Sequence, residues 1–258
     1  MDVELRGGIQ LPRGAAAGGI VQRRVVPEIL DELDASDPRA VQSRRDLQMV
    51  HGLMGIPGVL ARALGGLAPG ARLVDLGSGD GTLLLRVACR LGVPKTHVRA
   101  VLVDRTPAVS AQTQAAFDRL GWNVEVQSSD VFEWLNRPNP EPADVTTANL
   151  FLHHFREREL AALLRQASEQ TKRLVACEPR RSRTALVGAS CLRLIGCNDV
   201  TQHDATISVR AGFRDCELTA LWPARHEWEL AEWRSGPFLH AFEATHGHKL
   251  RPRFDPDA

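Results

Sequence analysis

The sequence predicts an α/β fold with a mostly parallel β-sheet, preceded by a small helical segment. Between residues 72 and 179, short runs of aliphatic and β-branched residues alternate with stretches of helical length. Strand–helix alternation at this spacing implies crossover connections, which make the strands parallel and cover both faces of the sheet. The stretch after residue 216 reads as consecutive strands with short turns, which predicts an antiparallel edge.

The N-terminal quarter predicts two further parts. Residues 1–25 are rich in Gly, Ala and Arg and lack periodicity, which predicts a flexible lead-in. Residues 26–68 predict a helical lid or subdomain. Its main helix starts at Ser36-Asp37-Pro38, a capping side chain followed by proline at a first-turn position, and ends at Gly55. Residues 69–258 then form the main domain.

Within the main domain, strands and helices alternate in a regular order. The tail adds three strands, at 216–223, 226–233 and 237–245, and the polar segment 198–204 is predicted to be a loop. The expected parallel strands are 72–77, 98–104, 124–127, 144–151 and 173–179, and the expected helices are 82–92, 107–120, 131–136, 156–170 and 183–196.

Composition excludes several classes of protein. The chain has 258 residues, 43% of them hydrophobic, which fits one globular domain with an elaboration. Its 32 Lys and Arg balance 31 Asp and Glu, so no overall field attracts nucleic acid or an anionic membrane. No apolar run approaches the roughly 18 residues that span a bilayer. We therefore expect neither nucleic acid nor membrane as a partner.

The cysteines argue for a reducing, cytoplasmic setting. They are odd in number, scattered, and form no Cys-x-x-Cys pair, so neither a disulfide framework nor a bound metal is expected. The five are Cys89, Cys177, Cys191, Cys197 and Cys216.

A glycine-rich turn, VDLGSGDG at residues 74–81, joins the first strand to the first helix. Glycines permit positive φ and let backbone N–H groups approach a ligand closely. The spacing G-x-G-x-G does not fit the G-x-G-x-x-G of nicotinamide cofactors. The carboxylates of Asp75 and Asp80 would repel a pyrophosphate but suit a ligand with an ammonium or sulfonium charge. A tight turn without a ligand is the alternative.

Two more acids follow strand ends. Asp104 closes the second strand in VLVDR, where an acid can accept hydrogen bonds from both ribose hydroxyls. Asp130 follows the third strand, where it can accept from an adenine amine or cap the helix that begins at Val131. These two roles of Asp130 are compatible. Taken singly, Asp104 also fits a solvated strand end.

In this order and spacing, VDLGSGDG, VLVDR, SSDVF and DVTTANLFLHHF resemble the successive motifs of class I S-adenosylmethionine-dependent methyltransferases, over roughly residues 70–245. The resemblance implies a seven-stranded Rossmann-like sheet and S-adenosylmethionine as cofactor, with S-adenosylhomocysteine as product. It places Asp104 at the ribose, Asp130 with Val131 at the adenine, and Asn149 near the sulfonium. The cofactor-binding residues it assigns are Asp75, Gly77, Ser78, Gly79, Gly81, Asp104, Arg105, Asp130, Val131 and Asn149.

Two further stretches, 27–55 and 198–223, are similar to bacterial small-molecule methyltransferases found beside type III polyketide synthases. This similarity implies secondary metabolism and a phenolic or polyketide-derived acceptor, methylated at oxygen. Methylation at carbon of an activated ring or β-dicarbonyl needs a similar site and stays open. So does a non-catalytic cofactor-binding or interaction protein with this fold. A homodimer is compatible with each.

Two histidines are candidates for acid–base work. His153 follows the fourth strand, at the expected mouth of the site, and His203 has Asp199 and Asp204 close by. A neighbouring carboxylate fixes the tautomer of an imidazole and raises its basicity. We assign acceptor contact to His153 and proton removal to His203. A polar strand end and a surface loop are the respective alternatives.

Overall fold

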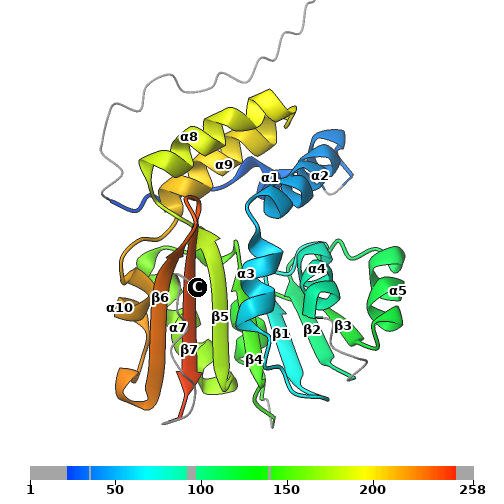
Figure 1. Ribbon diagram of the computed structural model, residues 1–258, viewed down its shortest axis with the longest axis vertical. Coiled ribbons are helices and arrows are strands. Elements are labelled where there is room, and N and C mark those ends of the chain that lie inside the picture. The colour runs from blue at the N-terminus through cyan, green and yellow to red at the C-terminus, as the bar shows by residue number, and fades with distance from the viewer. Residues whose placement is uncertain (1–21, 35, 92–96, 139–140, 248–258) are drawn as a thin grey trace, which may run out of the picture.

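A seven-stranded sheet with helices on both faces forms the body of the molecule (Figure 1). The computed structural model describes residues 22–247, apart from residues 35, 92–96 and 139–140. The strand order is β3-β2-β1-β4-β5-β7-β6, and β7 runs antiparallel to both of its neighbours. The predicted class, a mostly parallel sheet with an antiparallel edge, is confirmed. The strands are β1 (Arg72–Leu76), β2 (Arg99–Asp104), β3 (Asn123–Ser128), β4 (Val145–Asn149), β5 (Arg173–Pro179), β6 (Trp228–Ser235) and β7 (Leu239–His246).

The helices follow the predicted order through the parallel part of the sheet, and their bounds are as follows. The α-helices are α1 (Ile29–Glu32), α2 (Pro38–Leu53), α3 (Ile56–Ala63), α4 (Thr82–Leu91), α5 (Ala111–Arg119), α6 (Val131–Leu135), α7 (Glu157–Gln170), α8 (Arg183–Cys191), α9 (Asp199–Ala211) and α10 (Glu217–Leu221). Three short 3₁₀ turns are η1 (Leu152–His154), η2 (Leu192–Ile195) and η3 (Arg225–Glu227).

The chain reverses its direction of winding at β1. It passes from β1 to β2 and β3 on one side, then returns to β4 and β5 on the other. Leu76, at the end of β1, pairs with Val103 of β2 and with Ala148 of β4. Ligands of open α/β sheets bind at such a switch point, beyond the carboxyl ends of the strands.

Apolar side chains on both faces of the sheet form the core. On one face, α7 buries leucines at helical spacing, Leu160, Leu163 and Leu164. On the other face, α3 packs against α4 and β5, with Ile56 and Leu60 buried in the core. Helix α3 was expected in the lid, but its apolar side belongs to the sheet domain.

Four helices, α1, α2, α8 and α9, lie beyond the carboxyl ends of the parallel strands (Figure 1), and we call them the cap. Helix α2 begins as predicted, with Asp37 accepting from the N–H of Arg39 at 2.8 Å and proline at the first turn. Its most buried positions include Ser43 and Asp46. Asp46 accepts from the N–H of Asn198 at 2.7 Å, so α2 joins α9 through a polar face.

Two sequence predictions in the second half of the chain are wrong. Residues 199–204 were expected in a loop but belong to α9, which Asn198 caps by accepting from the N–H of Thr201 at 2.9 Å. Because some of the buried residues of α9 are polar, the sequence lacks the apolar spacing that predicts a helix.

Residues 216–223 were expected as a strand but contain α10. Leu218 and Trp222 fill the core from this helix, and the carboxylate of Glu232 accepts from the N–H groups of Leu218 and Thr219. The antiparallel edge therefore has two strands, β6 and β7.

The expected flexible lead-in falls mostly outside the described residues. Its described end, 22–25, is fixed by contacts of Arg23 and by the N–H of Arg24, which donates to the carbonyl of Arg210 at 3.1 Å. In the part of the chain that the structure describes, no helix combines the length and apolar character needed to cross a bilayer.

Candidate functional site

The glycine turn after β1 has the backbone that its sequence predicts. Gly77, Gly79 and Gly81 have φ values of +70°, +57° and +72°. A Cβ at Gly77 would lie 2.2 Å from the ring of Phe151, whereas a Cβ at Gly79 would have no heavy atom within 4 Å. The turn therefore needs glycine for its conformation throughout, and at Gly77 also for space. The open side of Gly79 leaves room for a ligand.

Asp104 connects the end of β2 to this turn. One carboxylate oxygen accepts from the N–H of Gly79 and the other from the N–H of Thr106, each at 2.9 Å. The neighbouring Arg105 is exposed, and its carbonyl accepts from the hydroxyl of Ser128. Asp104 is the last residue of β2, as the sequence predicts, and its ribose role stays a proposal.

Asp75 lies beneath the turn, 6% exposed. The hydroxyl of Thr147 donates to its carboxyl at 2.6 Å. Burial raises the pKa of Asp75 to about 7, and the charge of Asp104 acts in the same direction. A cationic group placed near this carboxyl would favour its ionised form.

Two buried polar atoms at this edge have no hydrogen-bond partner among the described residues, Oδ1 of Asn149 and Oγ of Ser78. An unsatisfied buried polar atom costs about 1–3 kcal/mol, so such atoms need a reason. Leu150, directly after Asn149, has a φ of +52°, a strained value typical of functional sites. Orphan acceptors, an open glycine and nearby carboxylates together fit an amino-acid nucleoside such as S-adenosylmethionine.

Asp130 and Val131 lie at the adjoining strand end. Asp130 caps α6 by accepting from the N–H of Phe132 at 2.8 Å, and Val131 is buried. The N–H of Ser129 donates to the carbonyl of Asp104 at 2.9 Å, which brings this corner next to the turn. The capping role of Asp130 is confirmed, and its adenine role stays a proposal.

The cap reaches the glycine turn through α2. The side-chain amide of Gln48 donates to the carboxylate of Asp80 at 2.6 Å. One turn further along α2, burial lowers the pKa of His51 to about 4, so its imidazole is neutral near pH 7. Sequence reasoning missed Gln48 and His51, because nothing local to α2 indicates which face meets the turn.

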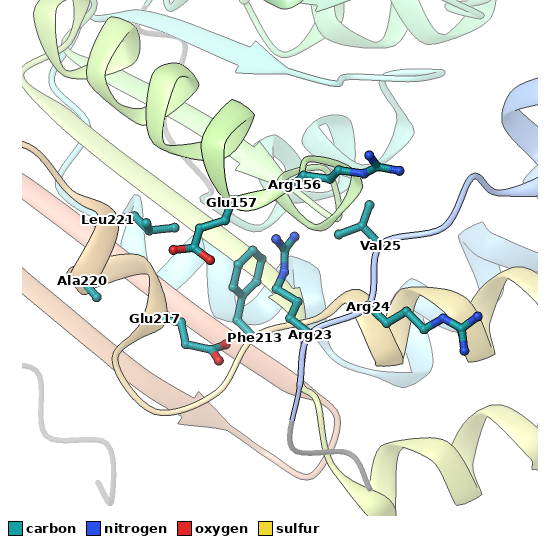
Figure 2. A pocket seen from close by; sticks show the side chains of 9 residues that line it. All are labelled: Arg23, Arg24, Val25, Arg156, Glu157, Phe213, Glu217, Ala220 and Leu221. Atoms are coloured by element: carbon teal, nitrogen blue, oxygen red, sulfur yellow. The ribbon is translucent and has the colours of Figure 1, made fainter. Parts of the chain in front are cut away.

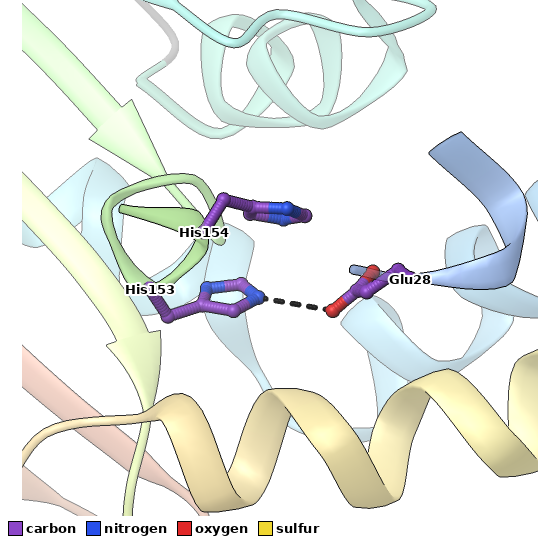
Figure 3. Close-up of side chains that lie close together, drawn as sticks. All are labelled: Glu28, His153 and His154. Atoms are coloured by element: carbon purple, nitrogen blue, oxygen red, sulfur yellow. Dashed lines mark hydrogen bonds and ion pairs between the residues drawn. The ribbon is translucent and has the colours of Figure 1, made fainter. Parts of the chain in front are cut away.

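His153 follows β4 as predicted, but both of its ring nitrogens face carboxylates. Nε2 lies 3.3 Å from Oε1 of Glu28 (Figure 3). Nδ1 lies 2.7 Å from Oε2 of Glu178, and the residue is 3% exposed. Burial alone lowers the pKa of His153, but the hydrogen bonds to Glu178 and Glu28 outweigh it and raise the pKa to about 9. In this arrangement His153 carries a charge near pH 7 and has no free nitrogen for an acceptor's proton. Its expected contact with the acceptor therefore finds no support in this geometry.

His203 lies on α9 and not in the expected loop, and its side chain is 41% exposed. Its Nδ1 lies 3.0 Å from Oδ1 of Asp204, which confirms the expected carboxylate partner. Asp204 also accepts from the N–H groups of Ile29 and Leu30 at 2.9 Å, and so ties α9 to α1. The other expected partner, Asp199, lies one turn away at the start of the helix.

A separate pocket of about 540 Å³ contains none of the predicted site residues (Figure 2). Beside it, the guanidinium of Arg23 lies 4.5 Å from the ring centroid of Phe213 and donates to carbonyls of η1, of the residue after η1, and of the last residue of α9. This region fixes the N-terminal segment to the body of the protein. The lining residues are Arg23, Arg24, Val25, Arg156, Glu157, Phe213, Glu217, Ala220 and Leu221.

Comparison with known proteins agrees with this geometry. A family profile described as "Methyltransferase domain" matches residues 73–173. A tRNA1(Val) (adenine(37)-N6)-methyltransferase of Erwinia tasmaniensis is 36% identical over 84 residues, which are 33% of this chain and 34% of that protein. The chain thus spans about a third of the length of the curated relatives it matches.

Solved structures share the fold across most of the chain. The plantazolicin methyltransferase BpumL, in complex with a triazolic desmethylPZN analog and S-adenosylhomocysteine, has a TM-score of 0.59 at 12% identity, covering 83% of this chain and 93% of that one. The mitomycin 7-O-methyltransferase MmcR has a TM-score of 0.54 at 20% identity, covering 84% and 60%. Residues 73–173 thus match a methyltransferase domain, and the chain has the fold of solved methyltransferases that bind S-adenosylhomocysteine.

Proposed function

We propose that this chain transfers a methyl group from S-adenosylmethionine to a small phenolic or polyketide-derived acceptor, at oxygen. The observation that carries this proposal is the position of the cap over the strand ends that hold the glycine turn and Asn149 (Figure 1). Gln48 binds the cap to the turn at Asp80, and Asp204 holds α1 against α9. An acceptor must reach the methyl donor beneath these helices, which favours a small molecule.

The residues of the turn and the neighbouring strand ends would hold the cofactor. S-adenosylmethionine supplies, when bound, a methyl group activated by a sulfonium. We assign the amino-acid part to Asp75, Ser78 and Asn149, which offer a buried carboxyl and two orphan polar atoms. Asp104 would accept from the ribose hydroxyls, with Arg105 beside it. Asp130 and Val131 would border the adenine, and Gly77, Gly79 and Gly81 let the backbone approach.

The acceptor's proton would leave through His203. This imidazole is exposed in part, and the carboxylate of Asp204 orients it. A positioned histidine contributes typically about 10²–10⁴-fold to such a step. An acceptor that ionises in water would need only alignment with the methyl group.

A nucleic-acid substrate is the alternative that the tRNA methyltransferase match suggests. That match covers a third of the chain and a third of that protein. The chain has a net charge of +1, and β4 ends in ANLFLHH, without the Asn/Asp-Pro-Pro-aromatic motif associated with amino methylation of adenine. We therefore favour the small acceptor, in a cytoplasmic enzyme of secondary metabolism with no membrane partner. A homodimer remains part of this proposal.

A substrate screen tests the proposal. The purified chain is incubated with S-adenosylmethionine and panels of phenols, β-dicarbonyl compounds and tRNA transcripts, and products are identified by mass spectrometry and NMR. We expect methylation of a phenolic oxygen, and a lower rate at limiting S-adenosylmethionine in the Asp104→Ala variant. A carbon-methylated product would favour the C-methyltransferase alternative, and methylated tRNA would overturn the small-acceptor proposal. Binding of S-adenosylhomocysteine without turnover on any panel would favour a non-catalytic protein.

A further inference from the structure

We propose that Glu28, His153 and His154 form a binding site for a divalent transition-metal ion. Each residue offers one donor atom, and the three atoms lie within 4.8 Å of one another. Figure 3 shows both imidazole rings extending from η1 toward the carboxylate of Glu28, which directly precedes α1. The site thus joins the cap to the end of β4.

The separation of the donor atoms suits an ion. Metal–ligand distances of about 2.0–2.2 Å place the ligands of a tetrahedral ion about 3.4 Å apart. The Nε2 of His153 and Oε1 of Glu28 already lie 3.3 Å apart. Small side-chain rotations of His154 would complete the set, and its side chain is 26% exposed, which gives it room to move.

A carboxylate behind His153 orients this ligand. Oε2 of Glu178 lies 2.7 Å from Nδ1 of His153, and Oε1 of Glu178 accepts from the N–H groups of Phe151 and Leu152. Metal-binding histidines commonly donate their second N–H to a carboxylate in this way, which fixes the tautomer and turns the other nitrogen to the metal. Here the other nitrogen is Nε2, which faces Glu28. An ion bound at Nε2 would displace the proton that His153 holds there without metal.

The outer groups support the same interpretation. Oδ2 of Asp31 lies 3.2 Å from Nδ1 of His154, so this second histidine also has a carboxylate beside it. The hydroxyl of Ser208 donates to Oε1 of Glu28 and fixes this carboxylate from α9. The cluster therefore has three candidate ligands and a set of orienting partners from three separate elements.

The donor set indicates the class of metal. Two imidazoles and one carboxylate suit Zn²⁺, Mn²⁺, Fe²⁺ or Co²⁺, whereas Mg²⁺ and Ca²⁺ prefer oxygen ligands. Three protein ligands leave a coordination position for water or another oxygen. If the proposed function holds, that position would suit the acceptor's hydroxyl oxygen. Metal binding itself does not depend on that function.

Titration of the full chain with Zn²⁺ tests the site. After treatment with a chelator, calorimetry should show one Zn²⁺ per chain, and Co²⁺ should give visible absorption bands typical of nitrogen and oxygen ligands. Zn²⁺ should also raise the melting temperature, since an ion that binds the folded state stabilises it. Absence of stoichiometric binding by either ion would overturn the proposal.

Matched variants separate this cluster from other donors. Glu28→Gln and His154→Ala should each weaken Zn²⁺ binding at least tenfold and abolish the Co²⁺ bands. The control is His226→Ala, an exposed histidine with the Glu227 carboxylate 3.3 Å away, which should bind like the parent. Equal binding in both site variants would assign the ion to other side chains, such as the exposed cysteines, and overturn the proposal.

Circular dichroism verifies that each variant is folded before titration. S-adenosylhomocysteine affinity, measured on the same variants, should stay unchanged. Loss of the ion with normal cofactor binding therefore tests the metal site separately from the proposed function.

Discussion

The carboxylate of Asp104 accepts a hydrogen bond from the backbone N–H of Gly79, with 2.9 Å between Oδ2 and N. This contact joins the tip of β2 to the glycine turn that follows β1, two segments 25 residues apart. It fixes the turn and holds a negative charge beside the open face of Gly79.

Asp104→Ala should weaken binding of S-adenosylhomocysteine by about 1–3 kcal/mol, because the ribose hydroxyls lose a charged acceptor. Isothermal titration calorimetry measures the effect. The control is Asp118→Ala, an exposed acid on α5, which should bind normally. Unchanged affinity in a folded Asp104 variant would remove this residue from the cofactor site.

Two glycines of the turn should respond differently to alanine. Gly77→Ala should destabilise the fold strongly, because its Cβ would lie 2.2 Å from the ring of Phe151. Gly79→Ala meets no atom within 4 Å, so its cost should be near the roughly 1–2 kcal/mol of a left-handed backbone, while the methyl group obstructs the ligand. Thermal melting with and without S-adenosylhomocysteine distinguishes them. Equal melting temperatures in the two variants would contradict the conclusion that Gly77 is crowded and Gly79 is open.

Asp75 should make stability depend on pH. Its pKa is raised to about 7 in the folded protein, from 3.8 as the ordinary value, so the folded state holds the proton more tightly. The stabilising contribution is full below pH 3.8 and is lost as pH rises through 7. Asp75→Asn removes this dependence.

Denaturant titrations of the parent protein and of Asp75→Asn between pH 5 and 8 measure the free energy of unfolding of each. As pH increases, the parent should lose stability relative to the Asn variant. A constant difference across that range would show that Asp75 does not titrate there.

Arg23→Met should destabilise the attachment of the N-terminal segment. The guanidinium donates hydrogen bonds to the carbonyls of Leu152, His153, Phe155 and Ala211. Methionine has no N–H group to donate, so these four carbonyls lose their hydrogen bonds from Arg23. We expect a loss of about 2–4 kcal/mol, which corresponds to a melting temperature lower by several degrees.

Arg24→Met is the matched control, because the Arg24 side chain is exposed and points away from Arg23 (Figure 2). Differential scanning calorimetry of both variants decides the point. The anchoring role fails if the two melt together.

His203→Ala should lower kcat by about 10² or more on an acceptor found in the screen, because it removes the proposed proton acceptor. Affinity for S-adenosylhomocysteine should stay the same. His246→Ala, a half-exposed histidine at the end of β7, serves as control. Near-normal kcat in the His203 variant would mean that transfer rests on alignment alone.

Much of the sheet and its cofactor corner could be predicted from the sequence, because their signals are local. Aliphatic runs of strand length between helical stretches specify a parallel sheet, and β1 to β5 lie within a few residues of their predicted bounds. Each glycine of the turn has the positive φ that its residue type allows. Asp104 is the last residue of β2 and Asp130 lies two residues beyond the end of β3, so the strand ends alone predict where both acids lie.

The two wrongly predicted elements are those whose secondary structure depends on contacts with residues far away in the sequence. Helix α9 buries polar side chains such as Asp204 against α1, and α10 donates two backbone N–H groups to the carboxylate of Glu232, so composition alone misleads at both. Local propensity is weak compared with such tertiary contacts.

The surroundings of His153 combine a feature that local sequence predicts with one that depends on tertiary contacts. The local pattern is enough to predict that this histidine follows β4. No local pattern predicts that Glu28, 125 residues away, and Glu178, 25 residues away, lie beside its two ring nitrogens, because the folded chain brings them together. Carboxylates at hydrogen-bond distance control whether an imidazole is a base, a fixed cation or a metal ligand. The distance between Glu28 and His153 depends on how the N-terminal segment folds over the end of the sheet.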